Sequence, residues 1–141
     1  MKKLVLSILF MVFAFTMNTY ADGTPVPFEQ LPENAKTLVV QNFDKNDILV
    51  IIKDRSEYEV KFNNGTEIEF DRKGNLTKVD CKHQQVPDAL IPAEVLSYVK
   101  ANYAAASITE WSKDDGQWKA ELSNSLELIF NRKYQFVGID D

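Results

Sequence analysis

Two stretches of the chain carry apolar residues at helical spacing, and each begins with an apolar residue followed by proline. In the stretch that starts at Leu31-Pro32, apolar positions recur every three or four residues and fall on one helical face. The stretch that starts at Ile91-Pro92 has the same spacing. Proline is tolerated in the first turn of a helix because the N–H that it lacks would have no partner there. The sequence therefore predicts two amphipathic helices.

Each predicted helix is followed by short segments in which apolar and polar residues alternate. Such a period of two is typical of strands with one buried and one polar face, separated here by turns such as Asn63-Asn64-Gly65. A sheet made of such strands is covered on one side only. The predicted strands are residues 48–53, 57–62, 67–71 and 75–80 in the first half, and 108–112, 117–123, 126–131 and 135–140 in the second.

The two halves align without a gap when the sequence is shifted by 60 residues. For example, Phe70 to Lys73 aligns with Phe130 to Lys133, and Tyr58 aligns with Trp118. A unit of this size has a thin core by itself, so we expect the two units to share one sheet. The predicted fold is α+β, with two tandem helix-plus-four-strand units that form one antiparallel sheet and both helices on one face. Residues 22–141 would be a single domain of two repeats, at about 27–81 and 87–141.

The first 21 residues have the pattern of a secretory signal peptide. Lys2 and Lys3 precede an apolar run from Leu4 to Met17, and small residues lead to a cleavage site after Ala21. A transmembrane anchor is the alternative, but the run is shorter than the roughly 20 residues that a spanning helix needs. We therefore predict a periplasmic or secreted protein without a membrane span after the signal is removed.

Composition and motifs exclude several classes of function. The net charge of −5 argues against nucleic acid as a partner, because phosphate binding needs clustered Lys and Arg. One Cys (Cys81) and one His (His83) cannot form a disulfide framework or a Cys/His zinc site. The segment from Asp44 to Asp47 begins like a calcium loop, but apolar Ile48 and Leu49 follow where a ligand and a glycine are needed. We find no catalytic motif, and predict a non-enzyme without metal or cofactor.

The segment from Asn64 to Gly74 reads Asn-Gly-x-Glu-x-Glu-Phe-Asp-x-x-Gly, and this segment is the most telling part of a wider pattern. Together with the Leu-Pro and Asn-Phe positions of the helix, it resembles the β-lactamase-inhibitor-like, PepSY-like family of small exported proteins from Bacteroides-type bacteria. The resemblance extends from about Phe28 to Asp140 and implies a fold like that of the β-lactamase inhibitor protein. It suggests recognition of a protein or peptide without establishing inhibition. The second unit departs from the pattern, with Ser125 and Tyr134 in place of the glycines.

The polar face of the predicted sheet is our candidate site, because it combines acidic residues with apolar ones. If Ile48, Val50 and Ile52 point toward the helices, their neighbours in the strand point away from them. Apolar groups surrounded by charge are typical of a protein-binding surface. It is equally consistent with the sequence that loops or the segment 22–27 cover these apolar residues. The proposed partner-binding residues are Leu49, Ile51, Glu57, Glu59, Glu67, Glu69, Asp71 and Trp111.

Three further interpretations stay open at this stage. A homodimer could use the same face, since a two-fold contact needs only one self-complementary surface. The protein could be a structural component of the envelope without a specific partner. A hydrolase could use the carboxylate pairs Glu57/Glu59 and Glu67/Glu69, although a flat face would not separate their pKa values. We also expect Tyr58 and Trp118 to be buried equivalents under their helices.

Overall fold

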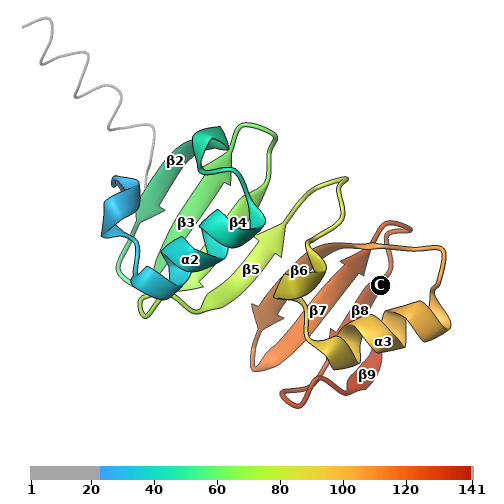
Figure 1. Ribbon diagram of the computed structural model, residues 1–141. Coiled ribbons are helices and arrows are strands. Elements are labelled where there is room, and N and C mark those ends of the chain that lie inside the picture. The colour runs from blue at the N-terminus through green and yellow to red at the C-terminus, as the bar shows by residue number, and fades with distance from the viewer. Residues whose placement is uncertain (1–22, 141) are drawn as a thin grey trace, which may run out of the picture.

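The computed structural model describes residues 23–140, which form one antiparallel sheet with helices on one face (Figure 1). The predicted signal peptide lies outside the described residues. Strands pair in chain order from β1 to β9. The first unit contains β1 (Thr24–Pro25), α2 (Glu33–Asn42), β2 (Ile48–Lys53), β3 (Glu57–Phe62), β4 (Glu67–Asp71) and β5 (Leu76–Asp80). The second contains α3 (Ala93–Asn102), β6 (Ile108–Asp114), β7 (Gln117–Leu122), β8 (Glu127–Phe130) and β9 (Phe136–Asp140).

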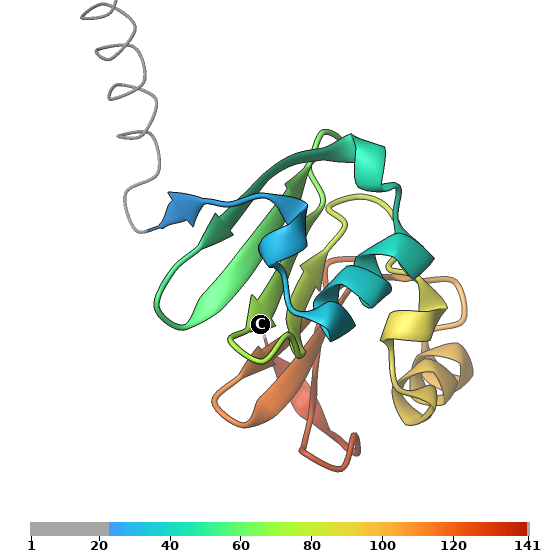
Figure 2. The ribbon, with the colours of Figure 1, turned by 60° about the vertical axis from the view of Figure 1, so that its left-hand side comes forward.

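Both helices cover the same face of the sheet, as Figures 1 and 2 show. Helix α2 buries Ala35 and Val39, and α3 buries Val95 and Val99 at equivalent positions of the repeat. Between helices and sheet lies one continuous core, to which alternate residues of the strands contribute. The predicted fold is therefore confirmed, with the core on the helical side and an open face on the other.

Strand β1 was not predicted. It pairs with the C-terminal end of β2. Pro25 lies opposite Ile52, and the Val26 N–H donates to the Ile51 carbonyl at 2.9 Å. A Cβ on Gly23 would overlap the Ile52 side chain, so this close approach requires glycine. The N-terminal segment thus lies along the edge of β2 and packs on one residue of the open face.

A β-bulge interrupts the first strand of each unit, at the same place in the repeat. The register shifts between Ile48 and Val50 in β2, and at the equivalent position in β6. A bulge adds one unpaired residue and so reverses the facing of the residues that follow it. Ile51 consequently lies opposite Val60 in the core, while Ile52 lies opposite Glu59 on the open face. The prediction that Ile51 faces outward was wrong for this reason.

Trp111 was also assigned to the open face, and the bulge in β6 places it in the core. Its side chain is only 1% exposed and lies between Val79 of β5 and Ala120 of β7. Its ring stacks on that of Trp118 with the centroids 4.8 Å apart. Trp118 is half-buried on the core face, and its counterpart Tyr58 is buried, in agreement with the prediction for Tyr58 and in part for Trp118.

We predict that truncating Trp111 lowers the stability of the fold far more than truncating Leu49, although the sequence placed both residues on the same face. Trp111→Ala should lower the free energy of unfolding by about 3–5 kcal/mol, because it empties a large volume where the two units meet. Leu49→Ala, at a residue that is 66% exposed, should change it by less than about 0.5 kcal/mol. Equilibrium denaturation with urea measures both, and similar costs for the two variants would contradict the assigned facing.

Candidate functional site: the open face of the sheet

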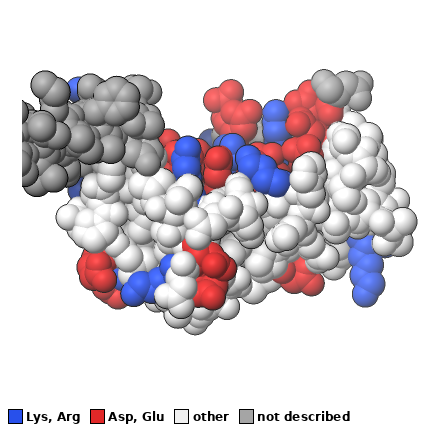
Figure 3. Space-filling view, turned by 90° about the horizontal axis from the view of Figure 1, so that it is seen from above, with Lys and Arg blue, Asp and Glu red and all other residues white. Residues whose placement is uncertain are grey.

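The open face carries charged residues at alternate positions of most strands, and they gather along one side of the molecule in Figure 3. The strand register aligns six carboxylates, one from each strand from β4 to β9. Each member lies directly opposite the next, so every neighbouring pair has like charge, which is unfavourable. We call this set the acidic row: Glu67, Asp80, Glu110, Glu121, Glu127 and Asp140.

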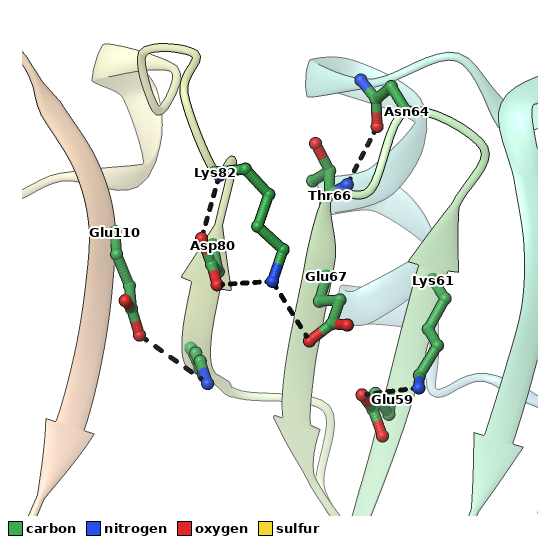
Figure 4. A network of polar contacts seen from close by, with 9 residues as sticks. Glu59, Lys61, Asn64, Thr66, Glu67, Asp80, Lys82 and Glu110 are labelled. Atoms are coloured by element: carbon green, nitrogen blue, oxygen red, sulfur yellow. Dashed lines mark hydrogen bonds and ion pairs between the residues drawn. The ribbon is translucent and has the colours of Figure 1, made fainter. Parts of the chain in front are cut away.

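Three lysines neutralise part of the acidic row, and Figure 4 shows one of them, Lys82, between Asp80 and Glu67. Lys82 Nζ lies 3.0 Å from Asp80 and 4.0 Å from Glu67, and Lys78 Nζ lies 3.7 Å from Glu110. At the other end, Lys119 Nζ lies 3.0 Å from Asp140. Within residues 23–140, Glu121 and Glu127 have no ion-pair partner. The row therefore keeps an excess of negative charge, and this excess lies over β7 and β8.

A shallow pocket of about 540 Å³ lies where the two units join, and we call it the junction pocket. Three carboxylates of the acidic row line it, those of Asp80, Glu110 and Glu121. Lys82 and the turn residue Ser123 also contribute to its wall. The pocket exists because β5 and β6 bring the ends of both units together, so each unit supplies part of it.

One carboxyl in the junction pocket holds its proton near neutral pH. Burial, a hydrogen bond with Glu121 and the charge of Asp80 together raise the pKa of Glu110 from 4.5 to about 7. Lys78 acts in the opposite direction without outweighing them. Glu121 lies directly opposite Glu110 in the pairing of β6 with β7, so its carboxylate is next to the Glu110 carboxyl.

The five acids predicted from the sequence all lie on the open face of β3 and β4, where Glu57 is opposite Asp71 and Glu59 is opposite Glu69. Glu67 belongs to the acidic row, whereas Glu59 lies 3.7 Å from Lys61. Burial and neighbouring carboxylates raise the pKa of Glu57, and burial also raises that of Glu69. The Asp71 carboxylate accepts N–H bonds from the following turn. These bonds hold the turn between β4 and β5 in place.

Most of the acidic row was missed because the sequence analysis followed the first unit. Glu127 and Asp140 are the repeat counterparts of Glu67 and Asp80, so the 60-residue shift was the signal that could have found them. Glu110 has no such signal, since its counterpart in the first unit is Val50. Only the pairing of β5 with β6 brings Glu110 opposite Asp80.

Other candidate residues serve the local structure. The Asp44 carboxylate accepts the Asn46 N–H at 2.9 Å and caps the turn Lys45–Asp47. Cys81 is buried, and burial raises the pKa of its thiol, which disfavours a reactive thiolate. In the part of the chain that the structure describes, no group of three His, Cys, Asp or Glu side chains is placed to hold a metal ion.

The known proteins that this chain resembles have the same architecture. The family model described as "Putative beta-lactamase-inhibitor-like, PepSY-like" matches residues 17–65 and again residues 56–138. The chain belongs to this PepSY-like family. The two successive matches agree with tandem units. No curated protein sequence matches the chain.

Solved structures from Bacteroides species share the fold over most of the chain. A "putative calcium-regulated periplasmic protein" from Bacteroides thetaiotaomicron is 36% identical, with a TM-score of 0.79, and covers 84% of this chain and 97% of its own. A "putative periplasmic protein" from Bacteroides vulgatus is 32% identical, with a TM-score of 0.81 and coverages of 86% and 98%. Another from that species is 26% identical, with a TM-score of 0.78 and coverages of 84% and 99%.

These descriptions confirm the predicted location, periplasmic or secreted. Among the described residues, no helix is long and apolar enough to cross a membrane.

We predict that Glu110 makes the stability of the fold depend on pH. A carboxyl whose pKa rises on folding stabilises the protein fully below pH 4.5, and this contribution is lost as the pH rises through about 7. Glu110→Gln keeps the neutral shape and should make this decline smaller, while the part that Glu57 and Glu69 contribute stays. Glu94→Gln, on the exposed side of α3, is the control and should keep the full decline. Thermal unfolding between pH 4.5 and pH 8 tests the prediction, and an unchanged decline in Glu110→Gln would contradict it.

Proposed function

We propose that the open face recognises a basic protein or peptide. The observation that carries this proposal is the acidic row, in which all five neighbouring pairs consist of two carboxyl groups. Opposed like charges destabilise a sheet, so the free protein holds a repulsion that cationic side chains of a partner would relieve. Complementary charge would also speed the encounter and weaken with salt.

The dimensions of the row favour a peptide segment over a small molecule. Adjacent strands lie about 4.8 Å apart, so six strands place the row over roughly 24 Å. An extended peptide advances about 3.3 Å per residue, and about seven residues would follow the row across the sheet. Lys or Arg at alternate positions of such a segment would face the carboxylates, and the excess charge at Glu121 and Glu127 would attract them most strongly.

The junction pocket offers a place for one basic side chain of that segment. Arginine is favoured there because its planar guanidinium can bond two carboxylates at once, and Glu110 and Glu121 are adjacent. A cation beside Glu110 would favour its ionised form and so lower its raised pKa. Binding near neutral pH should therefore release protons, which isothermal titration calorimetry detects as a dependence of the heat on the buffer.

Two other functions are less well supported. A hydrolase built on the predicted pairs would need them in a pocket that separates their pKa values, whereas Glu57, Glu59, Glu67 and Glu69 do not line the junction pocket. A structural envelope protein without a partner would have no need for the acidic excess that the lysines leave at Glu121 and Glu127. The inhibitor-like description of the family agrees with a protein partner and does not name one.

The test compares two charge reversals of equal size in different places. The probe is a fluorescent oligo-arginine peptide, and its anisotropy is measured against each protein. Glu121→Lys/Glu127→Lys should weaken binding about tenfold or more, because it reverses the charge where the row has no lysine partner. The control is Glu33→Lys/Glu94→Lys on the helices, which gives the same net charge. Equal weakening by both variants would mean that net charge alone attracts the peptide, and the proposal would be wrong.

The binding measurement is repeated with Ca²⁺, because one relative is described as calcium-regulated. Calcium takes six to eight oxygen ligands, and the described residues supply no enclosed group of that kind. We expect Ca²⁺ and Mg²⁺ at equal ionic strength to weaken peptide binding equally, by screening the row. A larger effect of Ca²⁺, lost in Glu121→Lys/Glu127→Lys, would instead assign a calcium response to the open face.

A further inference from the structure

The two edges of the sheet differ in whether a further strand covers them. At one edge, β1 covers the outer end of β2 and places Pro25 there, which has no N–H to offer a further strand. At the other edge lies β9, and no strand in the described part of the chain pairs with its outer side. Such an edge presents unpaired N–H and C=O groups to any strand that approaches.

Strand β9 lacks the features that usually keep an edge from pairing. It contains no proline and no lysine, and its one charged residue, Asp140, stands at its end. Val137 is 55% exposed and Ile139 is 47% exposed, with Phe136 beside them at 37%. Exposed apolar residues on an uncovered edge strand are typical of a site of strand addition.

The internal repeat indicates what such an edge does when a strand is available. Strand β5 is the counterpart of β9 in the first unit, and Val79 corresponds to Ile139. The outer side of β5 pairs with β6, which places Trp111 opposite Val79 and leaves Val79 fully buried. The chain therefore already shows strand pairing at this edge of a unit, and within residues 23–140 no strand takes this place beside β9.

We propose that β9 pairs with β9 of a second copy of this chain, antiparallel about a two-fold axis at Gly138. In this register Val137 of one copy faces Ile139 of the other, so the exposed apolar residues cover each other. The register of β9 skips Val137, so Phe136 stacks on Tyr98 on the helical face while Asp140 lies on the open face. The two Asp140 carboxylates would lie at opposite ends of the paired segment. A second copy is the favoured occupant because the same edge is self-complementary in this way. A two-fold contact uses the same edge of both copies and is closed by its own symmetry, so it ends at a dimer.

The proposed axis is perpendicular to the sheet, so the open faces of both copies would point to the same side. The dimer would carry two acidic rows on one continuous surface. Two linked sites bind a partner with repeated basic segments more tightly than one site does. This consequence concerns the proposed function, whereas the dimer itself rests on the edge and the repeat alone.

The first test uses sedimentation velocity over a wide range of protein concentration. The wild-type protein should form a dimer, and Val137→Lys should raise its dissociation constant about tenfold or more, because a lysine on an edge opposes pairing. Val40→Lys is the matched control, since Val40 is 58% exposed on α2, away from the edge. It should leave the dimer unchanged. Thermal unfolding should show that both variants stay folded.

The second test fixes the register. No atom lies within 4 Å of a Cβ built on Gly138, so Gly138→Cys fits without distortion. Facing residues of antiparallel strands have Cα atoms about 4.5–5.5 Å apart, which suits a disulfide. Gly138→Cys should crosslink two copies under mild oxidation, and Ser123→Cys, in an exposed turn, should not. A monomer at every concentration, a dimer unaffected by Val137→Lys, or equal crosslinking of both cysteine variants would overturn the proposal.

Discussion

The pairing of β5 with β6 is the contact on which both the stability and the candidate site depend. A unit of about 60 residues is only marginally stable by itself, and this pairing joins two thin cores into one. On the helical side it places Val79 against Trp111, and both are buried. On the open side it places Asp80 against Glu110. The residues that hold the units together therefore alternate with the residues that form the junction pocket.

Covering the sheet on one side only has an electrostatic consequence. Each strand must turn a polar residue outward at every second position, and the antiparallel register aligns these residues across the sheet. In this chain the aligned residues are mostly acidic, and the lysines beside them are too few to balance them. The raised pKa of Glu110 follows from this crowding together with its burial. The open face thus stores a repulsion, which is a physical reason to expect that it meets a cationic partner.

The tandem repeat also explains why the two ends of the sheet differ. Each unit ends in a strand whose outer side suits a following strand, and the first unit meets this need with the second. The last unit has no successor among the described residues, so Val137 and Ile139 stay exposed on β9. At the opposite end, the short β1 takes the place that a preceding unit would occupy. A two-fold dimer would bury the remaining edge with the same kind of contact.

Wherever polar and apolar residues alternate clearly, as in Glu57 to Phe62, the sequence by itself determined strand, facing and core. It also determined the helices, the repeat and the family. It could not determine the facing of Ile48 to Ile52, because five consecutive apolar residues carry no period, nor foresee that the bulge in β6 turns Trp111 inward. The pairing of Asp80 with Glu110 likewise joins residues of different units. Register across strands is set by packing of the whole sheet, so only the tertiary structure decided which carboxylates meet.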